Sequence, residues 1–343
     1  MGVADPIVLT MGDPAGIGPE IAAKSWAARR EQDVPAFALV GDPAAVAAVW
    51  DGPIEEIGMP GAASDVFAHA LPVIPVRCER DTVPGEPSGS SARCALQSLE
   101  LGVGLARAGS ASAVVTGPVS KKQLYQIGFT HPGQTEFIAE RCGVSRSNIA
   151  MMLAGPTLRC VPVTGHIPLA DVRDALSVEL ILARGRATLR GLIRNFGIEK
   201  PRLAVSGLNP HAGEQGEIGR AEIDVIEPAI ETLRSEGWDV SGPLPADTMF
   251  HERARAHYDA ALAMYHDQAL VPLKALHFDE GVNFTLGLPI VRAAADHGTA
   301  FEIAGSGTAL ASATIAALRM AAEAVSNRSA QGNPAPQSIA APL

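Results

Sequence analysis

Three histidines occupy equivalent places in the sequence, each shortly after an apolar run typical of a buried strand. His166 follows LRCVPVT and a glycine, His211 follows RLAVSGL and Asn-Pro, and His266 directly follows AALAMY. In open parallel α/β sheets, ligands gather outside the carboxyl ends of the strands. Three imidazoles there could hold zinc or a related divalent ion with open coordination positions. We therefore take them as candidate metal ligands, although a single histidine at such a place is more often a hydrogen-bonded loop residue.

Two aspartates lie where they could support this chemistry. Asp247 lies in PLPADT, and Asp267 directly follows His266. Metal-bound histidines usually hydrogen-bond to a carboxylate or carbonyl, so either aspartate could orient a ligand or act as a base. The alternative for both is a helix cap or a turn residue.

A later stretch carries isolated polar residues among apolar ones, as pocket walls do. Lys274, Asn283 and Arg292 lie in VPLKALHFDEGVNFTLGLPIVR. If they converge, they would hold a phosphate or carboxylate; otherwise they are solvated surface groups. The turn Gly12–Glu20 and the loop Thr116–Lys122 are further anion-site candidates, with a structural turn and a helix start as the alternatives.

The sequence lacks the common nucleotide-binding motifs. There is no GxxxxGK[ST] loop, and the GxG pairs at Gly16, Gly102 and Gly305 lack the third glycine of the dinucleotide fingerprint. An ordinary Rossmann domain is therefore disfavoured.

Apolar runs alternate with amphipathic segments, which favours a mostly parallel, helix-covered sheet. The expected strands are residues 7–10, 37–41, 113–116, 158–164, 202–208 and 260–265, and the clearest helices are 21–30, 171–195 and 221–236. The polar, proline-bearing tail 326–343 is expected to be disordered.

Bulk composition narrows the function classes. The chain has 343 residues, 47% of them hydrophobic, and a net charge of −10, which argues against nucleic-acid or anionic-membrane surfaces. The four cysteines form no CxxC pair, as expected for a reduced cytosolic protein. The amino-terminal segment has no signal-peptide pattern and no stretch is long and apolar enough to span a bilayer, so we expect a cytoplasmic location.

Taken together, these segments resemble the 4-hydroxythreonine-4-phosphate dehydrogenase family of vitamin B6 biosynthesis. The resemblance covers nearly the whole chain, from Gly12 to Gly305. It rests on GDPAGIGPE, VTGPVSKK, GQTEF, TGHIPL, GLNPHAGE, GPLPADT, AMYHDQ, GVNFTLGLP and DHGTAFEIAG.

The resemblance implies a fold like that of isocitrate and isopropylmalate dehydrogenases, with two α/β/α domains and a cleft between them, and not a Rossmann fold. We expect residues 1–130 plus 290–325 to form the domain with both termini. Residues 131–289 would form the domain carrying most metal and substrate residues.

The resemblance also implies a homodimer whose active site is shared across the subunit interface. One divalent metal, Zn, Mg or Co, would be bound by His166 and His211 of one subunit and His266 of the other. Substrate residues would be Thr135, Lys274, Asn283 and Arg292. By similarity to the wider group's cofactor loop, His297, Gly298 and Thr299 are candidates for contacting NAD or NADP.

One residue departs from the family pattern. The family reads GHTEF, whereas this chain has Gln134 in place of the substrate-contacting histidine. Glutamine can donate and accept hydrogen bonds but cannot become cationic or pass a proton. Gln134 is therefore either a tolerated substitution or a mark of an altered substrate.

The implied activity is NAD(P)-dependent oxidation of 4-phosphohydroxy-L-threonine. The product, 2-amino-3-oxo-4-phosphooxybutanoate, would decarboxylate to 3-amino-1-hydroxyacetone 1-phosphate. Two alternatives remain at this point: a 4-phospho-threonate or -erythronate dehydrogenase of the same fold, and a non-catalytic dimer cross-linked by metal.

Overall fold

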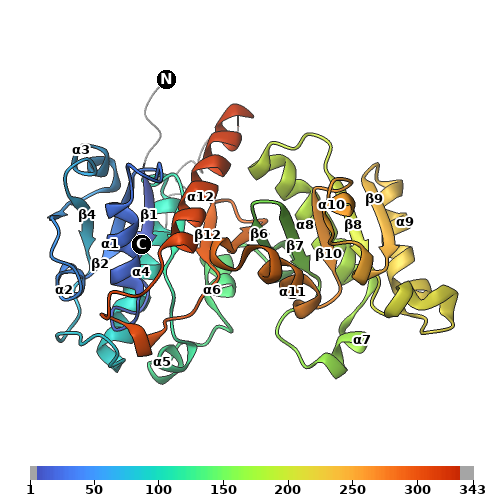
Figure 1. Ribbon diagram of the computed structural model, residues 1–343, viewed down its shortest axis with the longest axis horizontal. Helices are drawn as coiled ribbons and strands as arrows, with labels where there is room; N and C mark the ends of the chain where they lie inside the picture. The colour runs from blue at the N-terminus through green and yellow to red at the C-terminus, as the bar shows by residue number, and fades with distance from the viewer. Residues whose placement is uncertain (1–5, 333–343) are drawn as a thin grey trace. The chain divides into compact units, whose positions relative to one another are not determined.

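The alternation of apolar and amphipathic segments produces two α/β units in the computed structural model, which describes residues 6–332 (Figure 1). Unit 1 is Met1–Cys142 with Pro289–Leu343, and unit 2 is Gly143–Leu288. The α/β fold expected from the sequence is confirmed. The segment 131–142, which the sequence analysis placed in the second domain, groups with unit 1.

The sheet of unit 1 has its strands in the order β3-β4-β2-β1-β5-β12, and every pairing is parallel. Parallel strands covered on both faces read as continuous apolar runs, and β2 is such a run, FALVG, with all its residues buried. The strands are β1 (Ile7–Thr10), β2 (Phe37–Gly41), β3 (Ile54–Glu56), β4 (Leu71–Pro75), β5 (Val114–Thr116) and β12 (Arg292–Ala295).

Helices of unit 1 begin at recognisable caps and pack on this sheet. Asp42 caps α2, and Ser88 forms a capping box with Ser91 at the start of α4. The helices are α1 (Gly18–Ala27), α2 (Pro43–Ala47), α3 (Ala63–Val66), α4 (Gly89–Arg107), α5 (Lys121–Gln126), α6 (Gln134–Arg141) and α12 (Ser312–Ala330), with the short turns η1 (Pro60–Ala62) and η8 (Phe301–Ile303).

The carboxyl-terminal helix corrects one expectation. A disordered tail was predicted from residue 326, but α12 continues to Ala330 because Ala324 and Arg328 are buried. Arg328 donates to the carbonyls of Pro289 and Ile290 at 2.7 and 3.2 Å, which holds this turn in place. The rest of the predicted tail, 333–343, lies outside the described residues.

The sheet of unit 2 has the order β11-β6-β7-β10-β8-β9. β6 pairs antiparallel with both β11 and β7, whereas β7, β10, β8 and β9 are parallel neighbours. The strands are β6 (Ala150–Gly155), β7 (Leu158–Pro162), β8 (Arg202–Ser206), β9 (Asp239–Leu244), β10 (Ala260–Ala263) and β11 (Val282–Leu286).

The single helix expected over 171–195 is two helices. Leu176 adopts an extended backbone, and Ser177 then caps the second helix by accepting from Leu180 N. The helices of unit 2 are α7 (Val172–Ala175), α8 (Val178–Phe196), α9 (Glu227–Ser235), α10 (Glu252–Arg255) and α11 (His266–His277), with the short turns η2 (Arg146–Asn148), η3 (Leu169–Asp171), η4 (Pro210–Gly216), η5 (Glu222–Ile226), η6 (Ala246–Thr248) and η7 (Phe278–Glu280).

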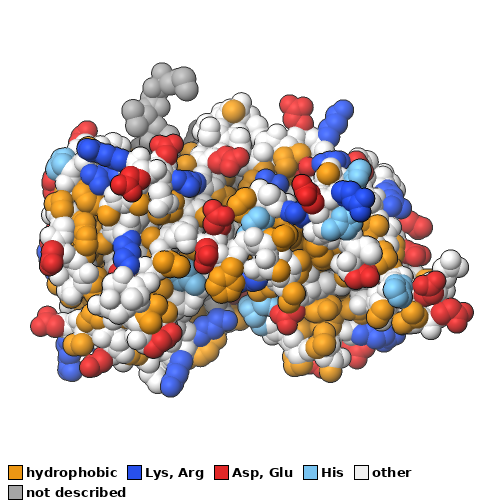
Figure 2. All heavy atoms as spheres, in the orientation of Figure 1, with side chains coloured by type: hydrophobic (Ala, Val, Ile, Leu, Met, Phe, Trp, Pro, Cys, Tyr) orange, Lys and Arg blue, Asp and Glu red, His pale blue; other side chains and the backbone are white. Residues whose placement is uncertain are grey.

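The surface carries mixed charge. On the face drawn in Figure 2, acidic and basic side chains are interspersed. Across residues 6–332, no helix is long and apolar enough to cross a membrane.

Candidate active site

Three strands of unit 2 bring the histidines to one edge of its sheet. β10 pairs in parallel with β7 on one side and β8 on the other, so the carboxyl ends of all three lie together. His166, His211 and His266 each follow one of these ends. This is the edge at which ligands bind in parallel α/β sheets.

His166 and His266 come close within one chain. Their ring centroids are 4.7 Å apart and the ring planes are inclined by 45°. Backbone bonds continue the β7–β10 pairing past the strand ends, because Val163 N donates to Ala263 O at 2.8 Å and Thr164 Oγ1 donates to Met264 O at 2.9 Å. The two loops are therefore held side by side.

Asp267 contacts the neighbouring imidazole. His266 Nδ1 lies 2.8 Å from Asp267 Oδ1. When Nδ1 carries the proton it donates to this carboxylate and leaves Nε2 as the metal-binding atom. Asp267 thus has the geometry of an orienting carboxylate.

His211 lies in a left-handed turn. Five consecutive residues, 211–215, have positive φ, with values of 52°, 52°, 80°, 41° and 55°. Left-handed backbone is costly for residues other than glycine, so surrounding contacts must hold it. Such a turn fixes the direction in which the side chain of His211 projects from the backbone.

Glu222 holds the segment that leads into this turn. Its side chain is buried, with 2% of the residue exposed. Its carboxylate accepts hydrogen bonds from Leu208 N at 2.8 Å, Asn209 N at 2.7 Å and Asn209 Nδ2 at 2.9 Å. A Cβ on Gly213 would lie 2.5 Å from Glu222 Oε2, so the close approach requires glycine there. Glu222 was not predicted from the sequence.

Gln268 links the His211 and His266 loops. Its Oε1 accepts from Met264 N at 2.6 Å and Ser206 Oγ at 2.8 Å, and its Nε2 donates to Gly207 O at 2.8 Å. The end of β8 is thereby tied to the end of β10. Gln268 lies in the AMYHDQ segment, but its spacing gives no signal of this role.

The three imidazoles do not close into a trio within the part of the chain that the structure describes. Among the described residues, the group of three ligating side chains whose ligand atoms all lie within 4.8 Å of one another is a different one, in unit 1. Asp247 is exposed on η6, and η6 lies against η4, the turn that carries His211. The other expected carboxylate is therefore also at this edge.

In unit 1, a buried arginine lies between two threonines. Arg292 is 3% exposed, and its Nη2 donates to Thr116 Oγ1 at 2.8 Å while its Nη1 lies 3.5 Å from Thr135 Oγ1. Burial lowers the pKa of Arg292 to about 10, and the charge of Glu136 opposes that shift. The guanidinium therefore stays cationic at neutral pH, and a buried cation of this kind favours an anionic ligand.

Gln134 begins α6 beside this arginine's threonine partner. Its Nε2 donates to Gly117 O at 3.1 Å. Its Oε1 is buried and has no hydrogen-bond partner among residues 6–332. A buried acceptor without a partner is costly unless a ligand supplies the donor.

The remaining sequence candidates occupy separate elements. Lys274 lies on α11 with its Nζ 5.3 Å from the Phe278 ring centroid, and Asn283 lies on β11. His297, Gly298 and Thr299 follow β12 in unit 1. Thr299 O accepts from Ile17 N at 3.0 Å, which joins this segment to the glycine-rich turn at Gly12–Glu20.

These features define an α/β protein with a histidine-bearing sheet edge in one unit and a buried cationic site in the other. The family model described as "Pyridoxal phosphate biosynthetic protein PdxA" matches residues 34–321, and the chain belongs to this family.

Named relatives extend the match over almost the whole chain. Proteins named 4-hydroxythreonine-4-phosphate dehydrogenase from Zymomonas mobilis and Erythrobacter litoralis are 53% and 52% identical, covering 95% and 94% of this chain and 97% of each relative. The crystal structure of the enzyme of that name from Klebsiella pneumoniae is similar with a TM-score of 0.85 at 35% identity, covering 94% of this chain and 99% of that one.

Proposed function

We propose that this chain is an NAD(P)-dependent dehydrogenase that oxidises 4-phosphohydroxy-L-threonine in pyridoxal 5'-phosphate biosynthesis. The 2-amino-3-oxo-4-phosphooxybutanoate formed would lose carbon dioxide to give 3-amino-1-hydroxyacetone 1-phosphate. The observation that carries the proposal is family membership, with more than half of the residues shared with the Zymomonas mobilis relative of that name. The phospho-threonate and phospho-erythronate alternatives have no comparable support.

His166, His211 and His266 are the proposed ligands of one divalent cation, Zn, Mg or Co. The donor set suits zinc or cobalt best, because imidazole nitrogens are common ligands of both metals and Asp267 can orient one of them. The ion would lower the pKa of the substrate hydroxyl and polarise its oxygen. Because one chain alone does not close the trio, we propose that two copies of the chain share it in a homodimer.

Arg292 is the proposed anchor for an anionic end of the substrate. Its buried guanidinium supplies planar, charge-assisted donors, and Thr135 lies beside it. Gln134 Oε1 would accept a hydrogen bond from the substrate, which would satisfy this buried acceptor. In unit 2, Lys274 and Asn283 would hold charged or polar ends and orient the reacting carbon.

Two further groups of residues are proposed, one for removing the proton and one for binding the cofactor. Asp247 and Asp267 are the proposed candidates for the base that removes the hydroxyl proton. His297, Gly298 and Thr299 are the proposed contacts of the dinucleotide, beside the glycine-rich turn that Thr299 joins. The nicotinamide would accept the hydride when bound.

The test is a substrate panel followed at 340 nm. Each of 4-phosphohydroxy-L-threonine, 4-phospho-D-erythronate and 4-phospho-L-threonate is paired with NAD and NADP, with and without a chelator. We expect reduction with the phosphohydroxy amino acid that is abolished by chelation and restored by added Zn, Mg or Co. Preference for a sugar acid, or metal-independent turnover, would contradict the proposal.

A further inference from the structure

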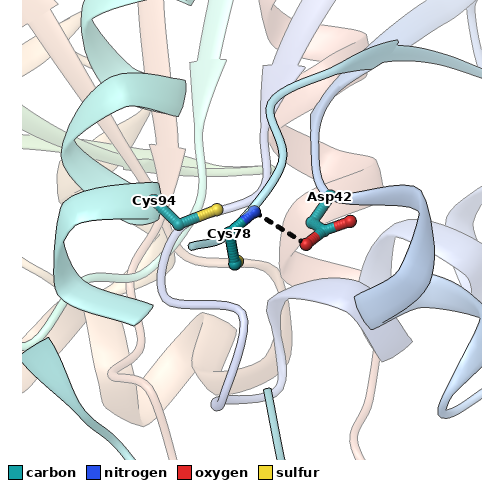
Figure 3. A group of neighbouring side chains, drawn as sticks. All are labelled: Asp42, Cys78 and Cys94. Atoms are coloured by element: carbon teal, nitrogen blue, oxygen red, sulfur yellow. Dashed lines mark hydrogen bonds between the residues drawn. The ribbon is translucent and has the colours of Figure 1, made fainter. Parts of the chain in front are cut away.

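A second set of ligating side chains gathers in unit 1, and none of its members is among the residues proposed above. Asp42, Cys78 and Cys94 each offer one ligand atom, and these atoms all lie within 4.8 Å of one another (Figure 3). Asp42 follows β2, Cys78 follows β4, and Cys94 lies in α4. Because β2 and β4 are parallel neighbours, the segments after them leave the same edge of the sheet, and α4 covers β2.

The carboxylate of this group is buried and fixed. Asp42 is 7% exposed; its Oδ1 accepts from Ala44 N at 3.0 Å and its Oδ2 accepts from Cys78 N at 2.9 Å. A carboxylate offers about four lone-pair positions, so it can still coordinate a cation. The hydrogen bond from the backbone amide of Cys78 also holds the segment that carries this cysteine against Asp42.

The two thiols that complete the set differ in how deeply they are buried. Cys94 is 2% exposed and its sulfur lies 3.5 Å from Val76 O, whereas Cys78 is half-buried. Figure 3 shows the Cys94 sulfur directed toward Cys78. An ion can reach the site past the half-buried Cys78. The buried thiol of Cys94 and the buried carboxylate of Asp42 then provide ligands that are screened from water.

The donors select one class of ligand. Thiolate sulfur prefers zinc and other thiophilic cations, and carboxylate oxygen is also a zinc ligand. Tetrahedral zinc with Zn–S near 2.3 Å and Zn–O near 2.0–2.2 Å places its ligand atoms within about 4 Å of each other, which small movements from the observed spacing would reach. Asp13 is a second carboxylate whose charge acts on Cys94, so the surroundings of these ligands are electronegative.

We propose that Asp42, Cys78 and Cys94 bind one thiophilic divalent cation, zinc-like in its preferences, that ties the ends of β2 and β4 to α4. Binding transfers two thiol protons to the solvent and leaves the fourth coordination position to water. The role is structural or regulatory, because none of the three residues belongs to the proposed catalytic set.

Cobalt(II) titration of the full chain, kept reduced with a phosphine, tests the proposal. Thiolate-bound cobalt has a near-ultraviolet charge-transfer band that imidazole ligands do not produce, so the histidine edge cannot mimic it. We expect one thiolate-bound cobalt per chain, retained in Cys142→Ser and lost in Cys78→Ser. Cys142 is the matched control because it is also a half-buried thiol of unit 1. A missing band, or a band that survives Cys78→Ser, would overturn the proposal.

A second measurement needs no variant and covers the case in which Cys78→Ser does not fold. The unmodified chain is alkylated with and without zinc, and each cysteine is followed by mass spectrometry. At free zinc ten times its Kd, modification of Cys78 should slow about tenfold while that of Cys142 is unchanged. Equal modification of Cys78 in both samples, or recovery of a Cys78–Cys94 disulfide in place of a zinc-protected pair, would reject the site.

Discussion

Two edges of parallel sheet in this chain collect ligating side chains in contrasting ways. In unit 2, histidines follow the carboxyl ends of β7, β8 and β10, and His166 and His211 are exposed. In unit 1, the segments after β2 and β4 meet α4 around Asp42 and Cys94, both buried. Parallel topology brings ligands together in both places, but the exposed edge is open to a substrate and the buried one suits a structural ion.

The two edges also differ in how their ligands are held. In unit 2, the loops that carry the histidines are held by buried neighbours such as Glu222 and Gln268 and not by the histidine side chains themselves. In unit 1, Asp42 is at once a helix cap, a partner of a neighbouring backbone amide and a proposed ligand. A substitution at the exposed edge should therefore change chemistry with little loss of stability, and the following predictions test this difference.

The largest effect is expected from His211→Asn. Asparagine tolerates the left-handed backbone at this position but cannot replace an imidazole ligand. Metal activation supplies several kcal/mol, and each 1.36 kcal/mol is tenfold in rate, so kcat/KM should fall by about 1000-fold or more. Steady-state rates at saturating metal measure this, and His257→Asn, at an exposed histidine of unit 2, should leave the rate unchanged. A kcat/KM within tenfold of the parent value would show that His211 is not a metal ligand.

A smaller effect is expected from Glu222→Gln. The amide keeps the size of the carboxylate and one oxygen that can accept from the backbone amides of Leu208 and Asn209. It loses the charge and the second acceptor oxygen, so Asn209 Nδ2 loses its partner. Changes in groups that orient a metal ligand cost about 10–100-fold in metal affinity. Metal titrations should show this loss, while Glu217→Gln, at an exposed residue directly after η4, should not. If the two variants bind metal equally, Glu222 has no positioning role.

The smallest effect is expected from Asp259→Asn, at the opposite ends of the same strands. Burial raises the pKa of Asp259, but its hydrogen bonds to Arg202 and the arginine's charge outweigh burial and lower the pKa overall. The ionised carboxylate therefore stabilises the fold above the unfolded-state pKa, and this contribution disappears as the pH falls through the lowered folded-state value. Unfolding at pH 7 should become easier by about 1 kcal/mol.

Three comparisons refine the Asp259→Asn measurement. The difference from the parent should shrink below about pH 4, near the usual aspartate pKa. Metal affinity should be unchanged. Asp224→Asn, in a solvent-exposed pair with Arg220, should have almost no effect on stability. A stability loss that persists at low pH would show that charge is not its cause.

The sequence predicted six of the twelve described strands, β1, β2, β5, β7, β8 and β10, whose apolar signal is local. The run FALVG coincides with β2, and the predicted strands at 158–164, 202–208 and 260–265 begin where β7, β8 and β10 begin. Six strands were missed. Of these, β3 and β9 are short or polar and occupy exposed positions of their sheets, whereas β4, β6, β11 and β12 are largely buried and were still not recognised from the sequence. The break between α7 and α8 was also missed, since Ser177 acts as a cap only once Leu176 has left the helix.

The candidate site was predictable only where a ligand directly follows a strand. His166, His211 and His266 each follow a strand end, so topology alone placed all three at one edge. Glu222 and Gln268 act through hydrogen bonds to other loops, and nothing in their local spacing indicates this. Cys78 and Cys94 form no sequence motif. Cys78 follows the end of β4 and Cys94 lies in α4, so the fold and not their spacing brings them together.

Anomalous scattering at the zinc edge, from crystals of the full-length protein grown with zinc, tests the central claim most directly. The account predicts an ion about 2.0–2.1 Å from imidazole nitrogens of His166, His211 and His266, drawn from two copies of the chain. Imidazoles that remain apart with no ion between them, in crystals of an enzyme that is active with zinc, would contradict it.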